Sequence, residues 1–206
     1  IPLRLVGSEM CIRDSVYGTC DPNPSHGGAA DKILEAAGIK VITGVLEAEC
    51  QELIRDFSMV QTQGRPWLIA KTAMSLDGRI TRPKGEGQWL SGTEARKEVQ
   101  KLRIEADAIL TSGKTVRFDD PALTLRGPEI SAQKTQPWRA VMTQQGFDQK
   151  GFQIFEDEWK ERTLIFQNQS NYEVLRTLSE KHGVNTVLLE AGGSLLGSFL
   201  DEGLID

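Results

Sequence analysis

The sequence predicts an α/β fold in which helices cover both faces of a sheet. Short apolar runs typical of buried strands alternate with segments whose apolar residues recur at helical spacing. The apolar fraction of 39% with mixed charge is ordinary for a globular protein, and 206 residues allow one domain or two small ones.

The first 15 residues show no clean helical or strand periodicity. Residues 6–15 resemble translated linker DNA more than a protein element, and a divergent natural start is the alternative. We therefore predict a non-native segment at 1–15 and leave it out of the predicted fold.

The sequence of residues 16–60 predicts a helix, a strand and a second helix. The glycine pair at 27–28 opens a helix that ends at Gly38, and a strand follows at 39–43. Cys50 is expected to be a small buried apolar residue of the next helix. That helix is predicted because apolar residues recur at helical spacing: Leu46, Cys50, Leu53, Ile54 and Phe57.

A polar linker at 61–66 ends in proline and marks a domain boundary. The S-x-x-E pattern at 91–94 predicts a capping box at the start of a helix. The apolar stripe of this helix is Ala95, Val99, Leu102 and Ala106. Strands are predicted at 67–73, 108–111, 139–142, 163–166 and 186–190.

Two further helices are predicted near the end of the sequence. Asn171 is expected to cap a helix that ends at Gly183, and another helix begins at Ser194. The buried face of the first is Val174, Leu175 and Leu178.

Composition excludes several classes of function. The net charge of −5 offers no basic field for nucleic acid, and no apolar run approaches the roughly 18 residues that span a bilayer. Cys11, Cys20 and Cys50 form no C-x-x-C pair, and His26 and His182 are the only histidines. These counts argue against a disulfide framework, a thiolate zinc cage and a multi-histidine metal site, and they favour a cytoplasmic protein.

The glycine pair Gly192-Gly193 follows an apolar strand and precedes a helix. Glycines let a backbone approach a ligand closely, and the first amides of a helix are free to bind a phosphate. The spacing is not the G-x-G-x-x-G of dinucleotide-binding folds, and a plain tight turn is the alternative.

Gly113-Lys114-Thr115 matches the end of the phosphate-binding P-loop motif, but the residues before and after it do not fit that motif. The motif needs a glycine five positions earlier, where the chain has Ala108. The segment 119–121, Asp-Asp-Pro, is also expected to block a helix there. Nucleotide hydrolysis is therefore excluded.

Four charged residues lie in or beside predicted apolar segments, where a charged side chain is unusual. Lys71 lies inside the predicted strand at 67–73, and Glu190 lies at the end of the last strand, where α/β sheets bind ligands. Arg103 lies at the margin of its helix's apolar stripe and can reach a cleft, with a solvated arginine as the alternative. Alternation along 123–126 is expected to put Arg126 on the face opposite the leucines.

A family resemblance rests on three segments in order, with Trp89 between the first two: 71–80, 111–126 and 188–196. Together they resemble the reductase domain of the bifunctional riboflavin-biosynthesis deaminase/reductase. The resemblance covers 66–206 and continues more weakly back to about residue 16. It implies a dihydrofolate-reductase-like domain at 66–206, truncated at its C-terminus. The remnant of a cytidine-deaminase-like domain precedes it at 16–60.

The resemblance implies an NADPH-dependent reduction of 5-amino-6-(5-phosphoribosylamino)uracil. The deaminase's zinc motifs, His-x-Glu and Pro-Cys with a further cysteine, are absent, so neither a metal nor deamination is expected. A related pterin or pyrimidine reductase, or an inactive cofactor-binding fragment, are the alternatives. NADPH versus NADH stays open, and so does the oligomeric state, a homo-oligomer included.

The resemblance also assigns roles to individual residues. Lys71 and Glu190 are the expected catalytic pair, with Lys71 donating a hydrogen bond or proton near the sugar carbonyl. Gly87 stands where the family commonly has a serine, and Gln144 where it has an Asp-Ser pair. Expected substrate contacts are Gly87, Arg103, Leu123, Arg126 and Glu190. Expected cofactor contacts are Ala73, Trp89, Thr115, Asp119, Gln144, Gly192, Gly193, Ser194, Leu195, Leu196, Gly197 and Ser198.

Overall fold

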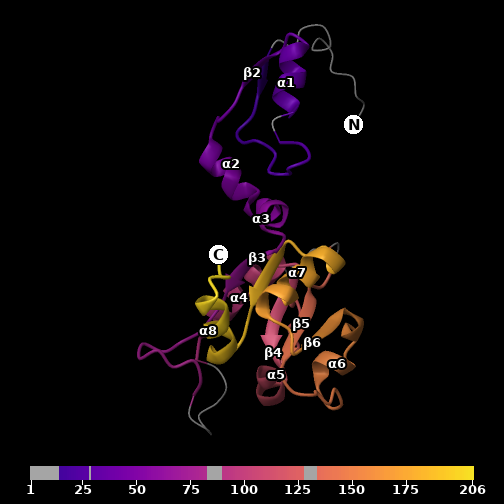
Figure 1. The fold of residues 1–206 in the computed structure, drawn as a ribbon. Helices are drawn as coiled ribbons and strands as arrows, with labels where there is room; N and C mark the ends of the chain where they lie inside the picture. Colours follow the sequence, from indigo (N-terminus) through magenta and orange to yellow (C-terminus); the bar gives the residue numbers. More distant parts are fainter. Residues whose placement is uncertain (1–13, 28, 83–89, 128–133) are drawn as a thin grey trace. The chain divides into compact units, whose positions relative to one another are not determined.

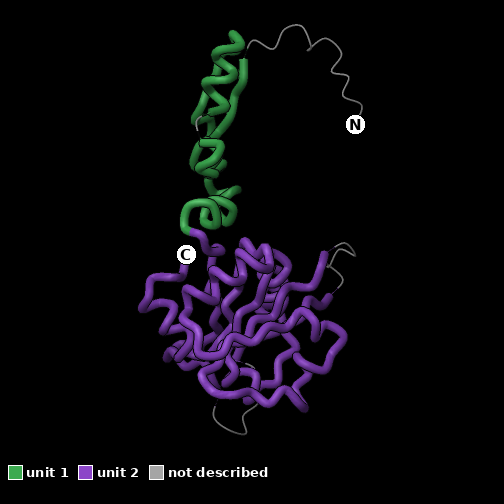
Figure 2. Tube along the Cα trace, turned by 45° about the vertical axis from the view of Figure 1, so that its right-hand side comes forward, with its two compact units in different colours: residues 1–63 green, residues 64–206 purple. Residues whose placement is uncertain are grey.

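The computed structural model describes residues 14–27, 29–82, 90–127 and 134–206. The chain divides into two compact units, residues 1–63 and residues 64–206 (Figure 2). Two predicted site residues, Gly87 and Trp89, lie outside the described residues.

The described residues of the first unit form two short parallel strands and three helices. Asp14 and Ser15, which the sequence analysis set aside with residues 1–13, belong to the first strand, and Ser15 pairs with Val41. Cys50 is half-buried, and no residue of the three helices is fully buried. The elements are β1 (Asp14–Val16), α1 (Ala29–Ala36), β2 (Lys40–Ile42), α2 (Glu47–Leu53) and α3 (Arg55–Gln63).

The single helix predicted from Leu46 is wrong, because the structure has two helices that meet at Ile54. Ile54 leaves helical geometry with φ −115°, and its amide bonds to the carbonyl of Gln51 instead of continuing the α-helical pattern. The polar linker is also shorter than predicted. Residues 61–63 belong to α3, which ends before Gly64 in the left-handed region at φ 66°.

The second unit is built on a five-stranded parallel sheet with strand order β3-β7-β4-β5-β6 (Figure 1). The predicted α/β class is confirmed. Parallel strands need long crossovers, and the helices between them supply these. The strands are β3 (Trp67–Ala70), β4 (Ala108–Ser112), β5 (Trp138–Thr143), β6 (Thr163–Gln167) and β7 (Thr186–Leu189).

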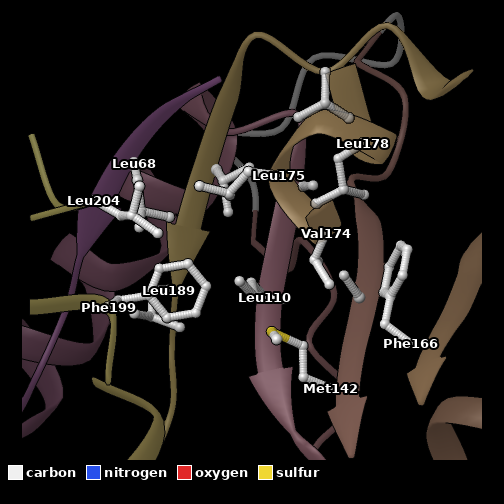
Figure 3. Packing of buried hydrophobic residues seen from close by; sticks show 14 residues of the cluster. Leu68, Leu110, Met142, Phe166, Val174, Leu175, Leu178, Leu189, Phe199 and Leu204 are labelled. Carbon is white, nitrogen blue, oxygen red and sulfur yellow. The ribbon is translucent and has the colours of Figure 1, made fainter. Parts of the chain in front are cut away.

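Two apolar clusters hold the second unit together. On one face, α7 and α8 pack on strand residues that include Leu110, Met142 and Leu189 (Figure 3). On the other face, the cluster contains Ile109, Val116, Leu123, Val141 and Ile154. The helices are α4 (Thr93–Glu105), α5 (Gly113–Asp119), α6 (Gln153–Glu156), the 3₁₀ turn η1 (Lys160–Arg162), α7 (Asn171–His182) and α8 (Gly193–Asp201). The predicted buried face of α7 is confirmed.

Two helix caps differ from the prediction. The capping box expected at 91–94 does not form, because α4 begins one residue later, with Gly92 as its N-cap. A capping box does open α7, where Ser170 and Glu173 bond reciprocally, and Asn171 is the first helical residue rather than the cap. In both cases the helix was predicted correctly, but the N-cap was assigned to the wrong residue.

The apolar stripe predicted for α4 is only partly buried. Ala95 is exposed, Val99 and Leu102 are half-buried, and Ala106 at the C-cap is buried. The one buried residue inside α4 is Arg103. A buried charge needs a partner of opposite charge. The partner of Arg103 lies at the end of β7.

The helix that Asp119-Asp120-Pro121 was expected to block is present as α5. A proline restricts the residue before it, and here Asp120 is already the C-cap, with φ 39°. The helix therefore ends before the restriction applies. Ser112 caps its start by accepting a bond from the Thr115 amide at 3.1 Å. The exclusion of a P-loop still rests on Ala108.

The strand-like alternation predicted for 123–126 is also wrong. Leu123 adopts a left-handed conformation at φ 49°, which no strand residue has. Leu123, Thr124 and Leu125 are all buried in succession, and Arg126 is exposed. The segment is an irregular loop whose leucines enter the core.

Candidate functional site at the carboxyl edge of the sheet

The predicted site segments that the structure describes follow the carboxyl ends of parallel strands. Ala70 and Leu110 are both register partners of Leu189, so β3, β4 and β7 come to the same edge of the sheet (Figure 1). The edge is where α/β sheets bind ligands. After these strands come Lys71 and Ala73 (β3), Thr115 and Asp119 (β4), Gln144 (β5), and Glu190 with the 192–198 segment (β7).

Glu190 forms a buried ion pair with Arg103 of α4. The guanidinium donates from Nε to Oε1 at 2.6 Å and from Nη2 to Oε2 at 3.0 Å, and only 9% and 11% of the two side chains are exposed. Nη1 donates to the carbonyl of Thr124 at 3.2 Å. The pair therefore joins α4, the end of β7 and the 121–127 loop.

The backbone of Glu190 is fixed through both its amide and its carbonyl. Its amide donates to the carbonyl of Leu110 at 2.9 Å, and its carbonyl accepts a bond from the Thr111 hydroxyl at 2.7 Å. These bonds extend the pairing with β4 one residue beyond the strand. The carboxylate of Glu190 thus lies at a defined place at the sheet edge.

Lys71 follows β3 rather than lying within the strand, which ends at Ala70. Its amide donates to the carbonyl of Leu189 at 3.0 Å, so Lys71 lies beside the start of the Glu190 segment. The side chain is half-buried, and no acidic residue among the described ranges pairs with its ammonium group. Ala73, two residues on, is also half-buried. An ammonium group here is available to a ligand.

The start of α8 presents backbone amides to the same edge. Gly192 is the N-cap and supplies no side-chain bond, and the first internal bond runs from the Leu196 amide to the Gly192 carbonyl at 3.2 Å. The amides of residues 193–195 therefore have no acceptor within the helix. They lie at the positive end of the helix dipole.

Nothing in the described chain requires glycine at position 192. Its backbone is extended, with φ −71° and ψ 167°, which any residue adopts, and a Cβ there would meet no atom within 4 Å. At Gly193 a Cβ would lie 3.5 Å from Ile80, an ordinary contact. Open space in front of unpaired amides fits a bound anionic group such as a phosphate.

The rest of the 192–198 segment faces inward. Leu195 and Leu196 pack against the apolar cluster under α7 and α8. The Ser198 hydroxyl accepts a bond from Asn171 at 3.1 Å and donates to the Leu195 carbonyl at 2.9 Å. Of the seven residues predicted to contact a cofactor here, Gly192, Gly193 and Ser194 are exposed.

The residues of α5 differ in how open they are. Thr115 shares a hydrogen bond of 2.9 Å between its hydroxyl and that of Ser112, and it is half-buried. Asp119 is exposed at the far end of the helix, although partial desolvation raises the pKa of its carboxyl above the usual value. Gly113 has a packing role, because a Cβ would lie 3.1 Å from both Phe147 and Thr143.

The loop that carries Leu123 and Arg126 is held by residues that the sequence analysis did not single out. Gln136 accepts from the Leu125 amide at 2.8 Å, and Gln100 accepts from the Arg126 amide at 2.9 Å. Arg139 donates to the carbonyl of Ala122 at 3.0 Å. Of these three residues, only Arg139 could have been singled out from the sequence, because it is a charged residue in a predicted apolar strand.

The described residues contain no cluster of three or more His, Cys, Asp or Glu side chains that would hold a metal ion. Within the same part of the chain, none of the helices combines the length and apolar character needed to cross a membrane.

Fold and site together define a parallel α/β domain whose candidate site lies at the carboxyl edge of the sheet. A family model described as the RibD C-terminal domain matches residues 66–206. The chain therefore belongs to the RibD C-terminal domain family.

The relatives support this assignment over most of the chain. The riboflavin biosynthesis protein RibD of Escherichia coli K12 is 36% identical over 90% of this chain and 58% of that protein. RibD of Mycobacterium tuberculosis H37Rv is 38% identical over 96% and 57%. The chain thus spans somewhat more than half the length of these relatives.

Solved structures agree with the family assignment. A RibD structure from Acinetobacter baumannii superposes with a TM-score of 0.83 at 32% identity, covering 94% of this chain and 59% of that one. A Thermotoga maritima protein is titled a diaminohydroxyphosphoribosylaminopyrimidine deaminase/5-amino-6-(5-phosphoribosylamino)uracil reductase. It superposes with a TM-score of 0.78 at 31% identity, covering 92% and 57%.

Proposed function

We propose that this chain carries the reductase activity given in the name of the Thermotoga maritima relative. The reaction is the NADPH-dependent reduction of 5-amino-6-(5-phosphoribosylamino)uracil to its ribitylamino product. Family membership over residues 66–206 supports the reaction class. The 206 residues contain no His-x-Glu motif, so we do not assign deamination to them.

The observation that carries the proposal is the start of α8. The amides of 193–195 have no acceptor within α8, and neither backbone geometry nor packing among the described residues requires glycine at 192; both features fit the diphosphate of a dinucleotide. When bound, NADPH supplies a hydride. Ala73, Thr115, Asp119 and Gln144 remain our predicted neighbours of the cofactor, and all follow strands that end at this edge.

The protein's own residues then orient the substrate and handle its proton. Lys71, whose half-buried side chain has no acidic partner among the described residues, donates a hydrogen bond or proton to the sugar oxygen. Glu190 accepts hydrogen bonds from the substrate at the end of β7. Arg126, exposed on its loop, offers a cation to the substrate phosphate, with Leu123 contributing packing.

The test is a titration followed by turnover. NADPH fluorescence should change on binding to the purified chain, and NADPH should be oxidised only when the phosphoribosylaminouracil is added. Parallel assays with NADH and with a dihydropterin distinguish cofactor preference and the related pterin reductases. An unchanged fluorescence signal together with no oxidation would remove the proposal.

A further inference from the structure

We infer that the second unit has a further anion-binding site, at the amino edge of its sheet, which takes a phosphate-sized oxyanion such as a phosphate monoester. The site is an open pocket of about 320 Å³. The lining residues that carry the argument are Asp107, Lys134, Trp138, Arg162 and His182. The inference goes beyond the proposed function, because none of these residues belongs to the candidate site.

The pocket lies at the edge of the sheet opposite the candidate site. Asp107 directly precedes β4, Trp138 is the first residue of β5, and Arg162 directly precedes β6. These strands are parallel, so their starts share one edge, whereas Glu190 and its neighbours follow strand ends. A strand rises about 3.3 Å per residue, so the five residues of β4 put roughly 15 Å between the two edges.

Arg162 is a half-buried cation without an acidic partner. Its guanidinium carbon lies 4.3 Å from the centroid of the Trp138 ring, and such stacking holds the plane of the group. No carboxylate of the described ranges pairs with it, and its Nε, which is closed to solvent, has no hydrogen-bond partner there. A guanidinium that is partly removed from water without an acceptor costs free energy, which a bound anion would offset.

Two further basic side chains line the same pocket. His182 is half-buried and lies edge-on to Trp138, with ring centroids 4.5 Å apart. Lys134 is also half-buried, and none of the ion pairs among the described residues includes it. Desolvation, with the charges of Lys181 and Arg162, lowers the pKa of the His182 ring. A bound anion would act in the opposite direction, because it favours the charged imidazolium.

Asp107 is the one acidic side chain among the described residues that line the pocket, and its carboxylate is already engaged. Its Oδ2 accepts bonds from the amides of Asn185 at 2.9 Å and Thr186 at 3.1 Å. Basic side chains therefore outnumber acidic ones at this pocket, although the whole chain has a net charge of −5. A dianion such as phosphate gains more from this arrangement than a monoanion such as acetate.

The experiment is an NMR titration of the full chain with inorganic phosphate, at constant pH and at an ionic strength held constant with sodium chloride. The chain has only two histidines, so the ring signals of His182 and His26 serve as probe and control. We expect phosphate to shift the His182 signal saturably in the millimolar range and to raise the pKa of its ring. Acetate should bind more weakly, and the signal of the exposed His26 should not saturate.

Variants test which side chains hold the anion. Arg162→Met should weaken phosphate binding by about tenfold or more, because hydrogen bonds to a charged group are lost. Lys134→Met removes a cation from the loop before β5, and it should weaken binding by a smaller factor and keep the fold. Lys160→Met is the matched control, because Lys160 is an exposed lysine of η1 that does not line this pocket.

Two results would overturn the inference. One is a His182 signal that phosphate leaves unchanged or moves only in step with His26, which would mean that the Trp138–Arg162 stack merely attaches η1 to β5. The other is wild-type phosphate affinity in both Arg162→Met and Lys134→Met. If Arg162→Met does not fold, Lys134→Met alone decides. Neither NADPH binding nor turnover enters the measurement, so a failure of the proposed function would leave this result intact.

Discussion

Asn171 donates a hydrogen bond from Nδ2 to the hydroxyl of Ser198 at 3.1 Å, and so joins the first residue of α7 to the second turn of α8. The same nitrogen donates to Glu202 at 2.8 Å, and Asn171 is only 6% exposed. These two bonds therefore attach α8, whose first backbone amides lie at the candidate site, to α7. Ser198 belongs to this anchor and not to the exposed start of α8.

Asn171→Ala should destabilise the protein by about 0.5–1.5 kcal/mol for each of the two hydrogen bonds that it removes, one to the half-buried Ser198 and one to Glu202, the exposed C-cap of α8. Urea denaturation measures the loss. Ser198→Ala should weaken stability less and leave NADPH affinity unchanged, since its hydroxyl faces α7. A marked loss of NADPH affinity in Ser198→Ala, with stability retained, would show that the side chain contacts the cofactor.

Gly192→Ala should separate binding from folding. A Cβ at 192 meets nothing within 4 Å, so the melting temperature should stay the same. NADPH affinity should fall by about tenfold or more, equivalent to at least ~1.4 kcal/mol, because the methyl group occupies the ligand's space. Fluorescence titration measures the affinity, and unaltered binding would contradict the proposed diphosphate site.

Gly113→Ala is the matched control for that experiment. Here the new Cβ lies 3.1 Å from Phe147 and Thr143, so the backbone or its neighbours must move. We expect a loss of about 1–3 kcal/mol in stability, typical of overpacking.

The strands were predictable because of how the sheet is built. A parallel strand covered on both faces is apolar along its whole length, as in β4, where Ala108 to Thr111 are buried. Predictions failed where one backbone conformation decided the structure. The left-handed Asp120 lets α5 end before Pro121, and the left-handed Leu123 turns an apparent strand into a loop. Composition does not reveal such non-glycine conformations.

The candidate site was predictable as a set of positions but not as a set of contacts. Lys71 and Glu190 attract notice because charge is unusual beside apolar strands. The partner of Glu190, however, lies 87 residues away in sequence, on a helix where Arg103 reads equally well as solvated. Only the fold shows that these two charges meet.

Lys71→Met should abolish most turnover and leave NADPH affinity unchanged. The variant keeps the half-buried stem of the side chain and removes the ammonium group, and general acid catalysis typically contributes about 10²–10⁴-fold to rate. The control is Lys114→Met, which alters an exposed lysine of α5. Unchanged kcat in Lys71→Met would exclude its proposed role at the sugar oxygen.

Arg139→Met should destabilise the protein and loosen the substrate loop. Arg139 is 1% exposed and pairs with both oxygens of Asp157 at 2.6 and 2.8 Å while it holds the Ala122 carbonyl. Removing one partner of a buried pair costs about 3–5 kcal/mol. Asp157→Asn keeps the shape and should cost less, because 23% of Asp157 is exposed. Calorimetry would contradict this order if both variants melted alike.

His182 should make stability fall as the pH drops below the usual histidine pKa of about 6.5. Burial, with the charges of Lys181 and Arg162, lowers the pKa of its ring, which lies 4.5 Å from Trp138. The unfolded chain then binds the proton more readily than the folded one. This contribution is complete above the unfolded pKa and is lost as the pH falls through the folded pKa. Asp119, whose pKa is raised, acts in the opposite sense and at more acidic pH.

His182→Gln should therefore flatten the dependence of melting temperature on pH in that range. His26→Gln is the control, because it removes the other histidine, whose side chain is 68% exposed. A scanning-calorimetry series measures both slopes against wild type. If His182→Gln keeps the wild-type slope and His26→Gln loses it, the half-buried ring at the end of α7 does not govern stability in this range.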